Sequence, residues 1–500
     1  MRAWTYLNRE TLAIAAIGLL LQGCTVGPKY RPPTAPTIRT YVPEPQPTVT
    51  VSGDGPAGIA QHFDATKEIP AQWWTLFHSQ EMNSMVEEAL ANSPTLEQAA
   101  AHLKESQEEL NARAGATKYP TVNGNASVEE EQLNLSAYGI PFPNPSPFTL
   151  LNGSVAVSYA LDLFGANRRL VEGLRAERDY EAWQLEGARL MLAGDVVSSA
   201  IRQAQLRKQI ELTQQLLALE EREQKIVEQR YDAGGIAERD VNNQRAIVAQ
   251  TRAAIPTLEE QLDAVNNQLA VLMGKSPAEA HIATITLDQV QLPQELPLSL
   301  PSSLVRQRPD IRAAESLLHQ ASANVGVATA DLYPQIVLSG GGGGVGTGFT
   351  TGGDVWNVGF SLAQPIYNGG ALRAEQRKAQ AAYQAAGGVY KETVLQAFQQ
   401  VADALYAIEH DAETLQARSE ASAESERNLR IAAERYQAGG ISQTALLEAQ
   451  KLQAQSELDR TSATAARYSD SVTLLEALGG GWWNQNKESH AAAKSADGAR

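Results

Sequence analysis

The sequence predicts a mainly α-helical chain with a few β-strands that take part in a β-barrel. Two proline-free stretches, about 166–233 and 371–438, are each long enough for a helix of more than sixty residues. Short stretches of alternating apolar and polar residues, which are typical of strands, precede both helices. Landmarks such as Tyr231 and Tyr436 recur in the same order about 205 residues apart. The chain is therefore predicted to be two tandem repeats of helix, strand hairpin, long helix and returning helix.

Residues 1–23 are predicted to be a lipoprotein signal peptide. A positively charged start precedes an apolar run, Leu12–Leu21, that is shorter than the about 20 residues a membrane-spanning helix needs. The run ends in Leu-Gln-Gly-Cys, which resembles a lipoprotein processing site, so Cys24 is the candidate lipidated N-terminus; the alternative is a buried thiol. Cys24 is the only cysteine, which excludes an intrachain disulfide. Thr25 is not the aspartate that favours inner-membrane retention in such lipoproteins, so the outer membrane is expected.

Residues 24–70 are rich in proline and threonine and show little hydrophobic periodicity, so they are predicted to be an extended tether. The first repeat is placed at 71–273 and opens with Trp73 and Trp74, for which packing is preferred over ligand binding. Two helices are expected next, and Pro94 suits the first position of the second one.

Alternation with a period of two predicts one strand hairpin in each repeat, at about 121–164 and 335–367. In the second hairpin, Trp356, Val358 and Phe360 alternate with smaller or polar residues, and the first hairpin has the same pattern. One apolar and one polar face suit strands with lipid on one side and water on the other. Two hairpins give four strands, whereas the smallest membrane barrels have about eight, so several chains must contribute.

The glycine run that begins at Gly340 could be mistaken for a phosphate-binding loop, because Gly341, Gly343 and Gly346 have the G-x-G-x-x-G spacing. Nucleotide motifs require a helix to open there, or a Lys-Ser/Thr pair to follow, and the sequence has neither. A strand crowded by its neighbours explains the glycines better. No cofactor is expected.

The long helices carry mixed heptads instead of a leucine-rich seam. Val196 and Gln203 belong to one stripe of residues that recurs every seven positions. The second repeat is placed at 302–483, and its returning helix has the same seven-residue spacing through Leu447 and Thr461. Gln, Ser, Thr and Ala occur in these stripes as often as Leu. Such helices suit a wall that has water on at least one face.

Residues 274–301 between the repeats are predicted to be a connector, in which Ile282, Ile285 and Leu287 favour a short strand. Residues 484–500 are small and polar and are predicted to be a disordered tail.

Charge and histidine placement exclude several classes of function. The formal net charge of −16 at pH 7 argues against a nucleic-acid partner. The seven histidines are scattered, with no H-E-x-x-H motif or paired metal spacing, so neither a metal site nor an enzyme is expected. Beyond the signal peptide, no stretch is apolar enough for a transmembrane helix, so a membrane crossing would have to use strands.

Several motifs together resemble the outer-membrane efflux channel family, in its lipoprotein, NodT-type branch, which is related to TolC. They are Gly-Pro-Lys-Tyr shortly after Cys24, the tryptophan pair, Arg-Pro-Asp-Ile-Arg-Ala-Ala-Glu at 308–315, the two Arg-Tyr-x-Ala-Gly turns and Leu-Gly-Gly-Gly-Trp at 478–482. The resemblance covers about Cys24 to Trp483. It implies a trimer whose twelve strands close one barrel in the outer membrane and whose helices form a 12-helix α-barrel through the periplasm.

The resemblance also implies partners and cargo. Such channels dock a periplasmic adaptor (membrane fusion protein) and an inner-membrane pump, often of the resistance-nodulation-division type, and pass drugs or other small molecules outward. An outlet for type I protein secretion would share the fold and stays as an alternative. A non-conducting periplasmic coiled-coil tether is an alternative of another class, although it would have no use for alternating strands.

Two sets of residues are functional candidates by resemblance. The glycine turns are expected to form the periplasmic tip and the adaptor contact; the alternative is that the two turn arginines only neutralise helix ends. The gate is expected after the second turn, where charged side chains interlock around the pore; the alternative is an ordinary exposed pair three residues apart. Relatives more usually carry Asp and Arg where this chain has Glu448 and Lys451, and Lys lacks the fork of Arg. The adaptor-contact candidates are Arg230, Tyr231, Gly234, Gly235, Arg435, Tyr436, Gly439 and Gly440. The gate candidates are Tyr436, Thr444, Glu448 and Lys451.

Overall fold

The structure, a computed structural model, describes residues 25–43, 48–139, 141–347 and 352–484. The predicted signal peptide, Cys24 and the tail beyond Asn484 lie outside the described residues. The chain forms two compact units, which are described separately. The first consists of Met1–Pro33, His102–Glu181 and Ala313–Tyr390, and the second of Thr34–Ala101, Ala182–Arg312 and Lys391–Arg500.

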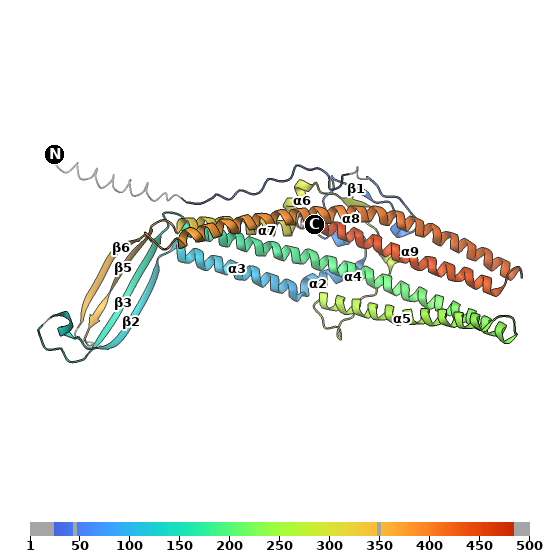
Figure 1. The fold of residues 1–500 in the computed structure, drawn as a ribbon, viewed down its shortest axis with the longest axis horizontal. Helices are drawn as coiled ribbons and strands as arrows, with labels where there is room; N and C mark the ends of the chain where they lie inside the picture. The colour runs from blue at the N-terminus through green and yellow to red at the C-terminus, as the bar shows by residue number, and fades with distance from the viewer. Residues whose placement is uncertain (1–24, 44–47, 140, 348–351, 485–500) are drawn as a thin grey trace, which may run out of the picture. The chain divides into compact units, whose positions relative to one another are not determined.

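The first unit contains an antiparallel sheet of four strands in the order β2-β3-β5-β6 (Figure 1). The strands are β2 (Thr121–Glu131), β3 (Phe148–Leu161), β5 (Gln335–Gly346) and β6 (Gly352–Ala363). All four lie within the two stretches where alternation predicted hairpins. The hairpins join through β3 and β5, which leaves β2 and β6 as the edges of the sheet.

Four helices continue from or lead into these strands. They are α3 (Pro94–Lys118), α4 (Ala166–Asp232), α7 (Pro309–Ala330) and α8 (Ala371–Gln437). The predicted long helices at 166–233 and 371–438 are confirmed, because α4 and α8 begin at the predicted residues and end one residue early. Both helices have 67 residues, as the tandem repeat predicts.

The N-terminal segment packs tightly against the first unit. The backbone N–H of Val26 donates to the carbonyl oxygen of Phe164 at 3.1 Å, and Arg169 Nε donates to the carbonyl oxygen of Val26 at 3.2 Å. Gly27 has a φ of +88°, and a Cβ there would lie 2.6 Å from Gly326 Cα. Only glycine fits this approach. The start of the predicted tether is therefore fixed against the helices.

In the second unit each long helix is accompanied by a returning helix (Figure 1). Helix α5 (Glu238–Leu272) follows α4, and α9 (Gln443–Ala477) follows α8. Both have 35 residues, so the repeat extends to the returning helices. Residues of the predicted heptads, such as Val196 and Leu447, are buried.

The core of the second unit confirms the packing role of the tryptophan pair. Trp73 and Trp74 form η2 (Trp73–Phe77) and are buried, next to α2 (Gln80–Asn92). Ser79 caps α2 by accepting a hydrogen bond from the backbone N–H of Met82 at 3.3 Å.

The connector strand was predicted in the wrong place. Strand β1 (His62–Asp64), within the predicted tether, pairs in parallel with β4 (Glu295–Pro297). The strand is therefore not at Ile282, Ile285 and Leu287, although Ile285 is fully buried. Local alternation could not reveal a three-residue strand whose partner lies more than 200 residues away in the sequence.

The folded part also extends further than predicted. Asn484 is buried and its Nδ2 donates to the carbonyl oxygen of Ile69 at 2.8 Å, so placing Asn484 in a disordered tail is wrong. Ile69 itself lies in the predicted tether, which packs against the helices and is not a free leash. The remaining elements are η1 (Pro56–Gly58), η3 (Leu135–Tyr138), η4 (Leu287–Gln289), α6 (Pro301–Gln307) and η5 (Trp482–Asn484).

Candidate functional site

The register of the four strands separates an apolar face from a polar face across the whole sheet. Val155 pairs with Gly342, which pairs with Trp356, and Tyr159 pairs with Leu338, which pairs with Phe360. Paired residues point to the same side of a sheet, so these side chains share one face. The opposite face carries small and polar residues: Asn123, Asn125, Ser154, Ser158, Ser339, Asn357 and Ser361. The predicted alternation of faces is confirmed.

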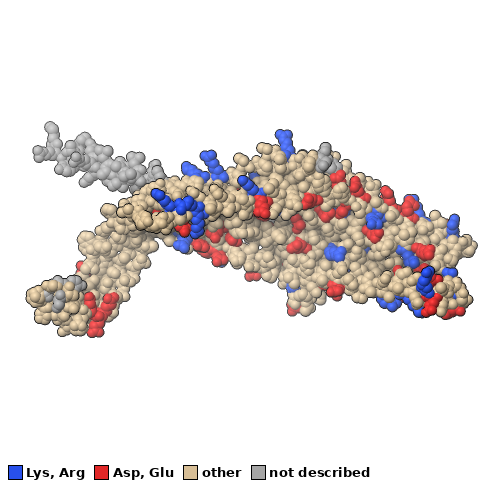
Figure 2. All heavy atoms as spheres, viewed as in Figure 1, with Lys and Arg blue, Asp and Glu red and all other residues tan. Residues whose placement is uncertain are grey.

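Crowding by neighbouring strands explains Gly341 and Gly343 of β5, as predicted, whereas a Cβ at Gly340, Gly342 or Gly344 would meet only ordinary contacts or open space. A Cβ at Gly343 would lie 2.1 Å from the carbonyl oxygen of Gly153, and one at Gly341 would lie 3.1 Å from Asn357 Oδ1. On the face shown in Figure 2 the sheet carries few charges apart from an acidic patch, and β2 ends with three consecutive glutamates. The polar face thus consists mainly of small and uncharged residues, with Glu129 and Glu131 at the end of β2.

The two glycine turns have the same backbone geometry. Gly234 N donates to the carbonyl oxygen of Tyr231 at 2.8 Å, and Gly235 N donates to that of Arg230 at 2.8 Å. The second turn repeats both hydrogen bonds, from Gly439 to Tyr436 at 3.0 Å and from Gly440 to Arg435 at 2.8 Å. The first glycine of each pair is left-handed, with φ of 74° and 73°. This is the Schellman arrangement, which ends a helix by satisfying its last carbonyl groups.

All eight adaptor-contact candidates are exposed. Tyr231 and Tyr436 are 41% and 40% exposed, so the two turns offer equivalent aromatic side chains. A large side chain left accessible at a helix end is available to a partner.

The gate candidates do not interlock with one another within the chain. Tyr436 and Glu448 are exposed and Thr444 is half-buried. Lys451 instead donates to Glu223 Oε2 on α4 at 2.5 Å, and the Glu223 side chain is only 8% exposed. The structure therefore links α9 to α4 through Lys451, and it does not pair Lys451 with Glu448.

Sequence reasoning missed Glu223 and its neighbour Glu220. Burial raises the pKa of Glu220 above its ordinary value, while Thr251 and Lys451 oppose that shift. Gln244 of α5 donates to the backbone carbonyl of Glu220 at 3.2 Å. Glu220 could have been identified from the sequence, because the heptad that includes Thr213 and Val227 passes through position 220. An acidic residue in a buried stripe marks a polar contact between helices.

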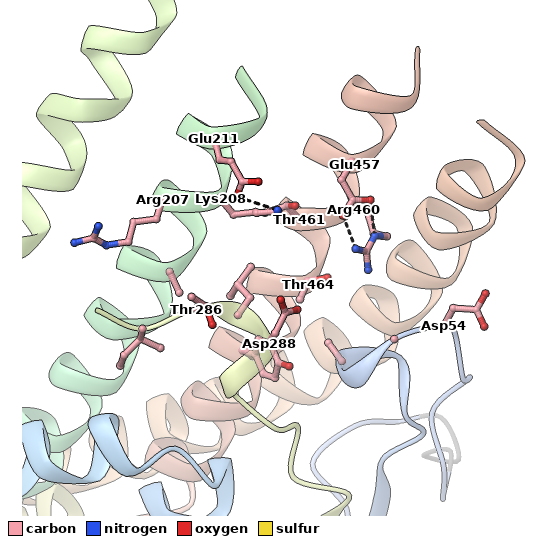
Figure 3. A pocket seen from close by; sticks show the side chains of 16 residues that line it. Asp54, Arg207, Lys208, Glu211, Thr286, Asp288, Glu457, Arg460, Thr461 and Thr464 are labelled. Carbon is pink, nitrogen blue, oxygen red and sulfur yellow. Dashed lines mark hydrogen bonds and ion pairs between the residues drawn. The ribbon is translucent and has the colours of Figure 1, made fainter. Parts of the chain in front are cut away.

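A cavity of about 180 Å³ lies where the connector crosses α4 and α9 (Figure 3). Its charges are largely paired: Lys208 donates to Glu211 at 3.0 Å, and Arg460 pairs with Glu457. Arg207 points away from the centre of the cavity in Figure 3. The cavity is therefore a polar seam between packed elements and not a second functional site.

Two absences apply to the described residues. Among them, no cluster of three or more His, Cys, Asp or Glu side chains is placed to hold a metal ion. No helix in that part of the chain combines the length and the apolar character that a membrane crossing requires.

The chain matches known proteins over nearly its whole length. The family model described as outer membrane efflux protein matches residues 85–275 and 300–480. Nodulation protein T of Rhizobium leguminosarum bv. trifolii is 29% identical over 90% of this chain and 91% of that protein. The pyoverdine export outer membrane protein OpmQ of Pseudomonas aeruginosa is 30% identical over 82% of this chain and 87% of that protein. These matches confirm the family predicted from the motifs.

The fold agrees with solved structures. The outer-membrane channel OprN superposes with a TM-score of 0.79 at 28% identity, over 92% of this chain and all of that chain. This likeness confirms the predicted fold class, a mainly α-helical chain whose strands belong to an outer-membrane β-barrel and whose long helices form a periplasmic tunnel. The chain belongs to the outer membrane efflux protein family and is an efflux channel of the bacterial outer membrane.

Proposed function

We propose that three copies of the chain close one barrel and pass small molecules, such as drugs or other toxic compounds, out of the cell. The observation that carries this proposal is the four-stranded sheet with one apolar face, one polar face and two open edges, β2 and β6. Four strands cannot close a membrane barrel, whereas twelve can. The name of OpmQ supports a small molecule as cargo, because pyoverdine export is what that relative does.

The channel works as the outlet of a three-part system with a periplasmic adaptor and an inner-membrane pump of the resistance-nodulation-division type. The adaptor contact is assigned to the two exposed glycine turns, whose equal geometry suits a partner with a repeated binding surface. Crosslinks from residues replacing Gly235 and Gly440 to an adaptor test this contact. The chain itself catalyses no reaction, since the pump supplies the energy. A type I secretion outlet would require a different inner-membrane partner.

The lipid anchor is assigned to Cys24. The signal-like sequence before it and the tight packing that begins at Val26 both support a mature chain that starts there. Mass spectrometry of the N-terminal peptide would detect the acyl groups, and an unmodified Cys24 would refute the assignment.

The gate is assigned to the region of Tyr436, Thr444, Glu448 and Lys451, and we include Glu223 in this proposal because Lys451 donates to it. The ion pair between Lys451 and Glu223 holds α9 against α4. It is partly buried, so removing one partner leaves the other charge uncompensated. We infer that this loss loosens the closed state of the channel.

Ion conductance in planar bilayers tests both the channel and the gate. Wild-type protein should conduct, which a non-conducting tether would not. Lys451→Gln, Glu223→Gln and Glu448→Ala should each raise the resting conductance. Glu420→Ala, which removes an exposed carboxylate of α8, is the control and should leave conductance unchanged. Equal resting conductance in all five proteins would remove these residues from the gate, while absence of any conductance would refute the channel.

A further inference from the structure

A groove of about 590 Å³ lies in the first unit where β3 passes into α4, beside the end of α3. Its volume falls within the roughly 300 to 1,000 Å³ of small-molecule sites. Three basic residues line it, Lys118, Arg168 and Arg175, together with the acidic residues Asp162 and Glu172.

The acidic residues of the groove are already occupied. Asp162 accepts hydrogen bonds from the backbone N–H groups of Asn167 and Arg168, at 3.1 and 2.9 Å, and from Arg168 Nε at 3.1 Å. Glu172 pairs with Arg169 at 2.7 Å and contacts His319 at 2.9 Å. Burial raises the pKa of Glu172, but the hydrogen bonds from His319 and Arg169 outweigh this and hold it below its ordinary value. Both carboxylates therefore already have hydrogen-bonding and basic partners within the protein.

Two basic residues of the groove have no ion-pair partner among the described residues. Lys118 and Arg175 are exposed, and neither makes an ion pair with any of the described residues. Lys118 Nζ lies 5.3 Å from the centre of the Tyr119 ring, which keeps the ammonium at the end of α3 beside the strands. The groove thus offers two uncompensated positive charges to an anion.

The groove also opens onto the apolar face of the sheet. Tyr159 lines it, and the strand register places Tyr159 on the same face as Leu338 and Phe360. That face lies against lipid in an outer-membrane channel, so the groove is at the level where the periplasmic headgroups begin. Tyrosine and basic side chains are characteristic of this boundary.

We propose that this groove binds the phosphate headgroup of an anionic phospholipid, whose acyl chains lie along the apolar face from Tyr159 outward. Lys118 and Arg175 contact the phosphate. Charge complementarity selects an anionic lipid over a zwitterionic one, and the adjoining apolar strands select a lipid over free phosphate. The proposal rests on the place of the sheet in the membrane and does not depend on the cargo or the gate.

The test is lipid retention by the purified, full-length channel, measured by native mass spectrometry after reconstitution with equal amounts of phosphatidylglycerol and phosphatidylethanolamine. Wild type should retain phosphatidylglycerol preferentially. Lys118→Gln with Arg175→Gln should lower that retention about thirtyfold, because each basic residue near an anionic headgroup contributes about fivefold to binding. Lys118→Arg with Arg175→Lys should restore it. Arg222→Gln with Lys225→Gln, which removes two exposed charges further along α4, should have no effect.

Three outcomes would overturn the proposal. Equal retention by wild type and the glutamine variant would show that the groove holds no lipid. Displacement of phosphatidylglycerol by millimolar inorganic phosphate would show a site for free anions. Cys24 is the only native cysteine, and its thiol is blocked in an acylated chain, so Arg175→Cys can be labelled selectively. If a soluble thiol reagent failed to label Arg175→Cys in the lipid-free assembled channel, a neighbouring copy would cover the groove. Bilayer conductance of the glutamine variant should equal that of wild type, which separates this proposal from the channel function.

Discussion

The returning helices α5 and α9 have the same length and follow turns with the same hydrogen bonds, yet their surroundings differ. Helix α9 buries thirteen side chains and α5 buries five, so α9 is an internal helix and α5 a peripheral one. Arg467 of α9 donates to Thr50 Oγ1 at 3.0 Å, and Tyr468 donates to the carbonyl oxygen of Val290 at 2.7 Å. The predicted tether, which contains Thr50, and the connector, which contains Val290, each occur once in the chain and both pack on α9.

Two ion pairs near the surface join α5 to α4. Arg245 pairs with Glu228 at 2.9 Å and Arg252 with Glu221 at 2.7 Å, and all four side chains are at least one-third exposed. Exposed ion pairs of this kind contribute about 0 to 1 kcal/mol. The two repeats therefore have the same backbone structure, and the segments that occur only once in the chain pack on α9 and make it, and not α5, part of the core.

The largest expected difference between the two helices comes from identical substitutions. Val472→Ala, at a fully buried site of α9, should lower the free energy of unfolding by about 2 to 3 kcal/mol through lost apolar burial and a cavity. Val271→Ala, at a site of α5 that is 62% exposed, should change it by less than about 0.5 kcal/mol. Denaturant unfolding of the detergent-purified channel measures both. Equal losses would mean that a neighbouring copy buries α5 as deeply as α9 is buried here.

A pH-dependent difference is expected at Glu476, which lies 205 residues after Val271 and so occupies the matching position. Burial, and then the nearby Asp195, raise the pKa of Glu476 from 4.5 to about 7. The folded protein holds this proton more tightly than the unfolded chain, so wild-type stability falls as the pH rises from about 4.5 through 7. Glu476→Gln cannot ionise and should be more stable than wild type at pH 8 by about 1 to 2 kcal/mol.

The gain from Glu476→Gln should disappear at pH 4.5, where wild-type Glu476 is protonated in the folded protein. Glu260→Gln, at an exposed position of α5, is the control and should show no pH-dependent gain. Melting curves at pH 4.5 and pH 8 are sufficient. A gain of the same size at both pH values would mean that ionisation of Glu476 does not destabilise the fold.

The smallest expected effect concerns the starts of the two helices. Ser442 caps α9 by accepting a hydrogen bond from Ala445 N at 3.2 Å, whereas Ala237 at the start of α5 has no side-chain cap. Ser442→Ala should therefore cost about 1 kcal/mol, and Ala237→Ser should add up to a similar amount. Thermal melting of the two variants and of the double variant checks this exchange, and a double variant far from wild type would contradict it.

The parts of the fold that follow from local chemistry were predictable. The ends of α4 and α8 follow from paired glycines after long proline-free stretches, and the strand faces follow from alternation around Trp356 and Phe360. The contacts that depend on distant neighbours were not predictable. The ion pair of Lys451 with Glu223 joins residues 228 positions apart, and its discovery requires knowing that α9 lies on α4.

The predictions for the tether and the connector were incomplete for the same reason. Their proline-rich composition correctly indicates extended backbone, but composition does not show what that backbone packs against. Glu476 is a further example, because its carboxylate occupies the space that a side chain at Gly194 would fill. A glycine within a long helix gives no sign of which residue will use the gap.

The close packing of Val26 and Gly27 gives the proposed acylation of Cys24 a consequence for the depth of the protein in the membrane. Cys24 precedes Val26 by two residues, a length of chain that spans at most about 7 Å, and the backbone N–H of Val26 is hydrogen-bonded to Phe164. Acyl chains attached to Cys24 would therefore enter the bilayer near the height of the strand ends. The proposed lipid modification would then limit movement of the barrel along the membrane normal, because such movement would draw the acyl chains out of the leaflet or press the segment around Val26 into it.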